Sequence, residues 1–100
     1  MSAPLLTVIV PAYNSEDYLD RALTTLVGYG DELEAIIVND GSKDRTAQIA
    51  DEWAARYPSV KVIHQENKGH GGAVNAGLAA ATGTHVRVVD SDDWLDRRAT

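Results

Sequence analysis

Residues 33–42 read LEAIIVNDGS, and this stretch decides the predicted fold. Its first part, residues 33–38, is a largely apolar run rich in β-branched side chains, which is typical of a strand covered on both faces. The Asn-Asp-Gly-Ser sequence that follows is a turn signal. A similar run, LLTVIV at residues 5–10, is ended by Pro11. Since strands covered on both faces occur mainly in parallel sheets, the two runs predict an α/β protein.

Helical and strand patterns alternate along the rest of the chain. Residues 19–26 carry apolar side chains at helical spacing, and Asn14 and Ser15 are candidates for the N-cap of this helix. A second helix is predicted around residues 50–57. The later segments are predicted as a third strand (60–65), a glycine-rich loop (66–72), a helix of small residues (73–81) and a fourth strand (85–89). This βαβαβαβ order predicts a mostly parallel sheet with helices on both faces and right-handed crossovers.

Composition narrows the range of functions. The chain has 100 residues, nine Lys plus Arg against fifteen Asp plus Glu, and a formal net charge of −6. This length predicts a single domain, residues 1–100. The absence of cysteine excludes a disulfide scaffold, a Cys-ligated zinc site and a thiol nucleophile. The acidic balance argues against nucleic-acid binding, whereas a phosphorylated small substrate is compatible with it if a metal ion supplies positive charge.

No targeting or membrane segment is evident in the sequence. The first four residues have no basic region of the kind that begins a signal peptide. No run approaches the roughly 18 apolar residues of a membrane span. We therefore expect a cytoplasmic chain without a membrane span.

Polar and glycine-rich segments follow each predicted strand. They are residues 11–14 (PAYN), 39–42 (NDGS), 67–72 (NKGHGG) and 90–93 (DSDD). In open parallel sheets, ligands bind beyond the carboxyl ends of the strands, so these four segments are expected at one edge. An aromatic ring, a carboxylate, a glycine-rich loop and an acidic cluster together suit a nucleotide with a divalent metal.

Each of these features also has an ordinary structural interpretation. Asp90 and Asp92, at positions i and i+2 of an extended segment, can reach one Mg²⁺ or Mn²⁺ ion, or they could cap a following helix. Their location directly after the fourth predicted strand favours the metal. Tyr13 could stack on a base, or it could be a half-buried tyrosine beside a helix start. Asp40 could accept hydrogen bonds from a base or ribose, or it could be a turn residue. For Tyr13 and Asp40 taken alone, the structural interpretation is favoured.

The glycine-rich segment fails the test for a dinucleotide fingerprint. Gly69 and Gly71 begin a G-x-G pattern, but the sixth position is Val74 where that fingerprint has a third glycine. A dehydrogenase is therefore disfavoured. The small residues that follow more simply allow the helix to pack closely on the sheet.

Taken jointly, four segments resemble the N-terminal half of an inverting family 2 glycosyltransferase of the GT-A fold. They are TVIVPAYNSEDYLDRAL (7–23), LEAIIVNDGSKDRT (33–46), NKGHGGAVNAGLAAATG (67–83) and VVDSDDW (88–94). The resemblance implies a Rossmann-like nucleotide-binding half, which is the N-terminal portion of a truncated GT-A domain. It also implies a nucleotide-diphosphate sugar donor and a divalent metal, Mn²⁺ or Mg²⁺.

By this resemblance, the donor-binding residues are Pro11, Tyr13, Asn14, Asp40, Gly69, Asp90, Ser91 and Asp92. Asp90 and Asp92 fall on the D-x-D motif, where the first lies near ribose and diphosphate and the second binds the metal. Val74 stands where many relatives have an arginine, and Lys68 or His70 are candidates to replace it. The general base of the family lies beyond Thr100, so no catalytic residue is assigned and this chain alone is expected to be inactive.

The alternative is a non-catalytic α/β module that self-associates, as a homo-oligomer, through an exposed sheet edge. For the longer glycosyltransferase, the resemblance is compatible with a place at the cytoplasmic face of a membrane.

Overall fold

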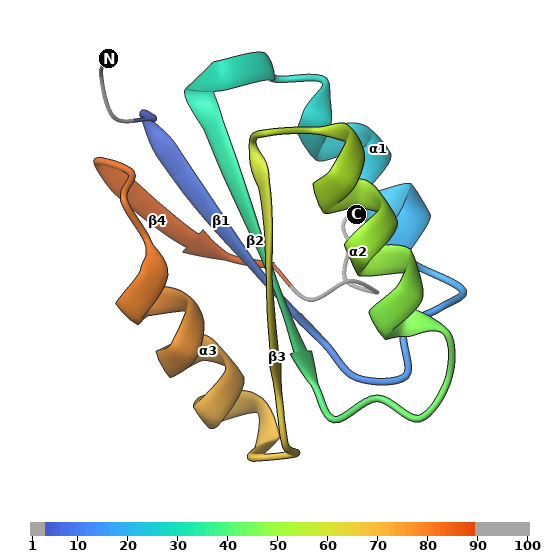
Figure 1. Ribbon diagram of the computed structural model, residues 1–100. Helices are drawn as coiled ribbons and strands as arrows, with labels where there is room; N and C mark the ends of the chain where they lie inside the picture. The colour runs from blue at the N-terminus through green and yellow to red at the C-terminus, as the bar shows by residue number, and fades with distance from the viewer. Residues whose placement is uncertain (1–3, 90–100) are drawn as a thin grey trace, which may run out of the picture.

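The computed structural model describes residues 4–89 of the chain. Its elements follow in the order β1 (Leu6–Ala12), α1 (Leu19–Val27), η1 (Gly30–Glu32), β2 (Leu33–Asp40), α2 (Thr46–Arg56), β3 (Val60–Gln65), α3 (Gly69–Ala80) and β4 (His85–Val88). The strands form one parallel sheet in the order β3-β2-β1-β4 (Figure 1), which confirms the predicted α/β class. Among residues 4–89, no helix has the length and apolar character needed to cross a membrane.

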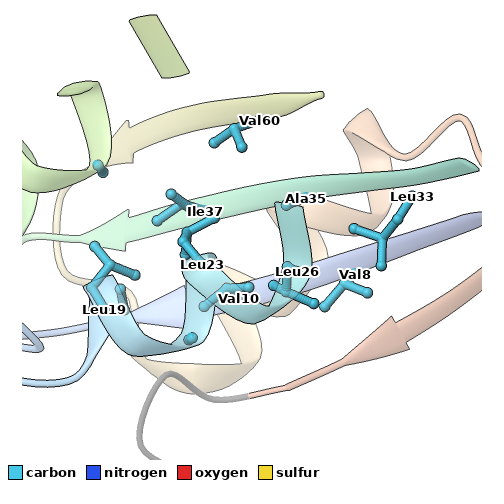
Figure 2. Close-up of a cluster of buried hydrophobic side chains, with 12 residues drawn as sticks. Val8, Val10, Leu19, Leu23, Leu26, Leu33, Ala35, Ile37 and Val60 are labelled. Carbon is cyan, nitrogen blue, oxygen red and sulfur yellow. The ribbon is translucent and has the colours of Figure 1, made fainter. Parts of the chain in front are cut away.

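Helices cover both faces of the sheet, as predicted. α1 and α2 lie on one face and α3 lies on the other (Figure 1). On the first face, Leu19, Leu23 and Leu26 of α1 pack with alternate strand residues that include Val10 and Ile37 (Figure 2). Each of these five side chains is at most 2% exposed. Burial of one such side chain stabilises a fold by about 1.5–3 kcal/mol, so this face supplies much of the core.

The opposite face is built for a close approach of α3. Ile9, Ile36 and Val38 form its core together with Ala73. A Cβ atom added at Gly77 would lie 2.4 Å from Cγ2 of Ile9. The helix therefore packs directly on the sheet through small residues, as the sequence suggests.

Pro11 lies inside β1 and does not end it, contrary to expectation. The N–H of Val89 donates a 2.9 Å hydrogen bond to the carbonyl of Ile9, so Ile9 faces β4. Alternate residues of a parallel strand face the same neighbour, and Pro11 therefore also faces the β4 side. Its missing N–H removes nothing from the β1–β2 ladder, which continues to the pair Ala12–Asn39.

The first helix begins at Leu19, and the predicted N-caps Asn14 and Ser15 do not cap it. Asn14 adopts a left-handed backbone conformation with φ of 49°, and its Oδ1 accepts a 2.8 Å hydrogen bond from the N–H of Lys43. The N–H of Ser15 donates to Oγ1 of Thr46 at 2.7 Å. Both residues therefore brace the loop before α2. The carbonyl of Ser15 also accepts from the N–H of Leu19 at 2.9 Å, so the backbone of Ser15, and not its side chain, leads into α1.

Helix α3 begins at Gly69, earlier than the predicted start at Ala73. Its first turn is Gly-His-Gly-Gly, which lacks the apolar periodicity from which a helix is predicted. The N–H of Gly69, whose φ is 82°, donates to Oδ2 of Asp40 at 2.9 Å. A side chain from the end of β2 thus anchors the start of α3. Strand β2 itself reaches Asp40, beyond its predicted end at Val38.

The strand order changes direction between β1 and β4. From β1 the chain moves outward through β2 to β3, and it then returns to the other side of β1 as β4. In open parallel sheets, ligands bind at such a switch point, beyond the carboxyl ends of the strands. The candidate site is therefore expected beside the ends of β1 and β4.

Candidate functional site

Two loops at the carboxyl edge of the sheet brace each other. One follows β1, and the other connects β2 with α2. The N–H of Asn14 donates to Oγ of Ser42 at 3.0 Å, and the N–H of Ser42 donates to Oδ1 of Asn39 at 3.1 Å. Tyr13 lies on the first of these loops and is 48% exposed. Its ring is therefore accessible for stacking on a planar ligand.

Asp40 is buried at the end of β2, with 5% of its surface exposed. Its Oδ1 accepts hydrogen bonds from Nε2 of Gln65 at 2.9 Å and from the N–H of Lys68 at 2.7 Å. Its Oδ2 accepts the bond from Gly69 described above. Burial alone would raise the pKa of this carboxyl, but the hydrogen bonds outweigh burial and lower the pKa below its usual value. Asp40 therefore holds a negative charge beside the start of α3 at neutral pH.

The packing of Asp40 against the segment before α3 was not predicted. Gly41 has a φ of 73°, and a Cβ atom added to it would lie 2.7 Å from the backbone nitrogen of Asn67. The turn after β2 therefore touches the β3–α3 segment directly. The only sequence signal is that Asp40 lies just after one predicted strand and Gln65 at the end of another; the structure pairs these two polar residues in the register.

Sequence reasoning also missed a series of hydrogen-bonded side chains centred on His64. Nδ2 of Asn39 lies 3.0 Å from Nδ1 of His64, and Nε2 of His64 lies 2.8 Å from Oδ1 of Asp51. Because Oδ1 of Asn39 accepts from Ser42, its amide nitrogen donates to the ring, and Nε2 then donates to Asp51. These hydrogen bonds connect α2 to the loop that carries Ser42.

Asp44 is a further carboxylate that the sequence did not single out. Its Oδ1 accepts from the N–H and Oγ1 of Thr46 at 2.9 and 2.5 Å, and its Oδ2 accepts from the N–H of Glu16 at 3.3 Å. Burial raises the pKa of Asp44, but these hydrogen bonds lower it further than burial raises it. An Asp ahead of a helix start is a recognisable signal, and here it joins both loops to the first turn of α2.

Five predicted donor-binding residues lie at or beside the carboxyl edge of the sheet: Pro11, Tyr13, Asn14, Asp40 and Gly69. The others, Asp90, Ser91 and Asp92, lie outside the described residues, so their roles stay predictions. Val89, the last described residue, bonds to Ile9 of β1 at the switch point.

The predicted metal site is not formed by the described residues alone. Residues 4–89 contain no group of three or more His, Asp or Glu side chains that could hold a metal ion. The predicted ligands Asp90 and Asp92 are not among these residues. Lys68 and His70, the basic candidates beside the donor, are both exposed at the start of α3.

The sequence and structure are similar to those of known glycosyltransferases. The chain is 43% identical over 97 residues to the EpsH protein of Bacillus subtilis (strain 168), an alignment that covers 96% of this chain and 28% of EpsH. The chain therefore spans less than a third of the length of this relative.

Two solved structures share the fold with high coverage of this chain. The mannosyltransferase PcManGT from Pyrobaculum calidifontis, in complex with GDP-Man and Mn²⁺, gives a TM-score of 0.79 at 30% identity, covering 92% of this chain and 28% of its own. Residues 1–349 of S. aureus TarS, in complex with UDP-GlcNAc, give a TM-score of 0.78 at 35% identity, covering 94% of this chain and 30% of that TarS fragment. The family model described as "Glycosyl transferase family 2" matches residues 7–99, and the chain belongs to that family.

Proposed function

We propose that this chain carries the nucleotide-sugar half of a glycosyltransferase active site, which binds a nucleoside diphosphate sugar and a divalent cation, Mn²⁺ or Mg²⁺. The observation that carries the proposal is the position of the braced loops, beside the switch point where parallel sheets bind nucleotides. The solved neighbours in complex with GDP-Man and Mn²⁺ and with UDP-GlcNAc support this class of ligand.

In this proposal, the base is recognised by Tyr13 and Asp40. The exposed ring of Tyr13 stacks on the base, while the backbone of Pro11 and Asn14 forms the adjoining wall of the site. An ionised carboxylate has about four acceptor sites. Three of them on Asp40 are occupied by described residues, which leaves one on Oδ2 for an N–H at the base edge. Asp40 would thus both anchor the start of α3 and accept a hydrogen bond from the base.

The cation in this proposal is held by Asp90 and Asp92, with Ser91 between them beside the ribose and diphosphate. Two carboxylates at positions i and i+2 supply the hard oxygen ligands that Mn²⁺ and Mg²⁺ prefer. Both residues closely follow Val89 at the switch point, which fits a place next to the diphosphate. When bound, the cation acts as a Lewis acid that stabilises charge on the departing nucleoside diphosphate.

The transfer step that we propose is a direct displacement. The acceptor hydroxyl oxygen forms a bond to the anomeric carbon from the face opposite the nucleotide, so the configuration inverts. The bond from that carbon to the diphosphate oxygen breaks, and the nucleoside diphosphate leaves with the electron pair. The hydroxyl proton passes to a general base that we assign to no residue of this chain. We therefore expect these 100 residues to bind the donor without transferring the sugar.

Isothermal titration with uridine, guanosine and thymidine diphosphates in the presence of Mn²⁺ tests this function. We expect one of them to bind, and we expect Asp92→Asn to weaken that binding by about tenfold or more. Glu52→Gln makes the same change of charge on an exposed side chain of α2 and should leave the affinity unchanged. A chain that is folded by circular dichroism but binds none of the three would contradict the proposal.

A second candidate is self-association through β4. Val86 and Val88 of this strand are 40% and 41% exposed, and β4 is an edge strand in the described part of the sheet. Exposed apolar edges favour pairing between chains. Light scattering across a range of concentrations should then show dimers that Val86→Lys abolishes, and a chain that stays monomeric would remove this candidate.

A further inference from the structure

A buried carboxylate lies at the end of the sheet opposite the proposed donor site. Glu34, the second residue of β2, is 4% exposed. Its Oε1 accepts from Oγ1 of Thr7 at 2.8 Å and from the N–H of Thr82 at 3.1 Å, and its Oε2 forms an ion pair with Nζ of Lys61. One carboxylate thus joins β1, β2, β3 and the turn between α3 and β4.

The turn before β4 is held to β1 by the same network. Oγ1 of Thr7, which donates to Glu34, also accepts a 2.8 Å hydrogen bond from the N–H of Gly83. A Cβ atom added at Gly83 would lie 2.6 Å from Oγ1 of Thr7 and 2.7 Å from its nitrogen. The turn therefore lies directly on the backbone of β1, with its hydrogen bonds directed to Thr7 and Glu34.

Burial only weakly constrains the register of β4. All four of its residues are exposed, and in the described sheet it pairs with β1 alone. When one face of a strand is buried, a slip by one residue is costly because it turns apolar side chains to solvent. This penalty is reduced in β4, because its two valines are 40% and 41% exposed and its polar residues are exposed as well. Its register therefore depends largely on backbone hydrogen bonds and on the turn that precedes it.

We propose that Glu34 is a positioning residue for the donor site: acting through Thr7 and the turn at Thr82–Gly83, it fixes the register of β4 on β1 and so places the residues that follow β4. The second part rests on the proposed function, because Asp90 and Asp92 are the proposed metal ligands. The first part concerns the described residues alone. Through this positioning, a residue at the amino end of the sheet would affect metal binding at the carboxyl end.

Hydrogen exchange tests the first part. In Glu34→Gln and Thr7→Val, the amides of Thr84, His85 and Val89 should exchange about tenfold faster or more. These amides donate to the carbonyls of Pro4 and Leu5, just before β1, and of Ile9 within it. Amides in the β2–β3 ladder should change much less. Thr7→Ser keeps the hydroxyl and should restore slow exchange. Acceleration that is equal in all strands, or no acceleration in either variant, would overturn the proposal.

Titration of the same variants with Mn²⁺ and the nucleoside diphosphate that wild type binds tests the second part. We expect Thr7→Val to weaken binding by roughly 2- to 30-fold, and Thr7→Ser and Glu52→Gln to bind like wild type. Loss of slow exchange in β4 with unchanged affinity would overturn the link to the site. If wild type binds no nucleotide, the proposed function fails, and the exchange pattern alone decides whether Glu34 positions β4.

Discussion

Strand β2 has a buried carboxylate near each end, and the two are held in different ways. Glu34, at the amino end, accepts hydrogen bonds from side chains of other elements and pairs with Lys61. Burial alone would raise the pKa of Glu34, but the bonds from Lys61, Thr7 and Thr82 lower it to about 2. Asp40, at the carboxyl end, accepts mainly from backbone N–H groups that precede or begin α3.

Glu34 therefore joins several strands, whereas Asp40 anchors a single loop. The bonds of Glu34 join several elements, so its loss affects how the strands sit together. The bonds of Asp40 reach the continuous segment from Gln65, at the end of β3, to Gly69, at the start of α3, so we expect its loss to act mainly there. This segment lies at the carboxyl edge of the sheet, where the donor site is proposed.

Removing Glu34 should give the largest effect. Glu34→Ala leaves the hydroxyls of Thr7 and Thr82 and the ammonium of Lys61 without their acceptor, and we expect a loss of about 3 kcal/mol in the free energy of unfolding. Urea denaturation measures this, with Glu52→Ala as the control on an exposed surface. A loss no larger than that of the control would show that the network adds nothing to stability.

The ionisation of Glu34 should also make a large contribution to the pH dependence of the free energy of unfolding. The pKa of Glu34 is lowered from 4.5 to about 2 on folding, so its ionisation stabilises the fold above pH 4.5. That contribution, on the order of 2–3 kcal/mol, should be lost as the pH falls from 4.5 towards 2. Asp40 and Asp44 have lowered pKa values and act in the same direction. Urea midpoints at several pH values should fall less steeply in Glu34→Gln than in wild type, and equal slopes would contradict this account.

Changing Asp40 should have a smaller and more local effect. Asp40→Asn retains one carbonyl oxygen but presents an amide group to one of its present donors, and we expect a loss of about 1–2 kcal/mol. Faster exchange should be confined to the amides of Lys68 and Gly69. Acceleration that spreads to the β1–β4 ladder would mean that the two ends of β2 are not independent.

An effect no larger than that at Asp40 is expected at Asn14. Asn14→Ala removes the acceptor for Lys43 and puts alanine in a left-handed conformation, which together cost about 1–2 kcal/mol. Asn14→Gly loses the same hydrogen bond but tolerates the positive φ, so it should be the more stable of the two. Thermal unfolding of both variants checks the order, and the reverse order would rule out backbone strain as a cause.

Local patterns predicted the strands well, but they could not reveal contacts between distant residues. The apolar runs at 5–10 and 33–38 locate β1 and β2 because side chains buried on both faces leave a continuous signal. The start of α3 was misplaced because its first turn is mostly glycine and is anchored by Asp40 from another strand. The position of Asp40 at the carboxyl edge of the sheet was predictable, whereas its bond to Gln65 depends on the register between two strands.

The proline in β1 also removes one rung from the β1–β4 ladder. The N–H of Val89 donates to Ile9, and the next rung of a parallel ladder would need an N–H at Pro11 to reach the carbonyl of Val89. Proline has no such donor, so this one hydrogen bond cannot form. Separating the two strands at this level therefore breaks no hydrogen bond donated by position 11.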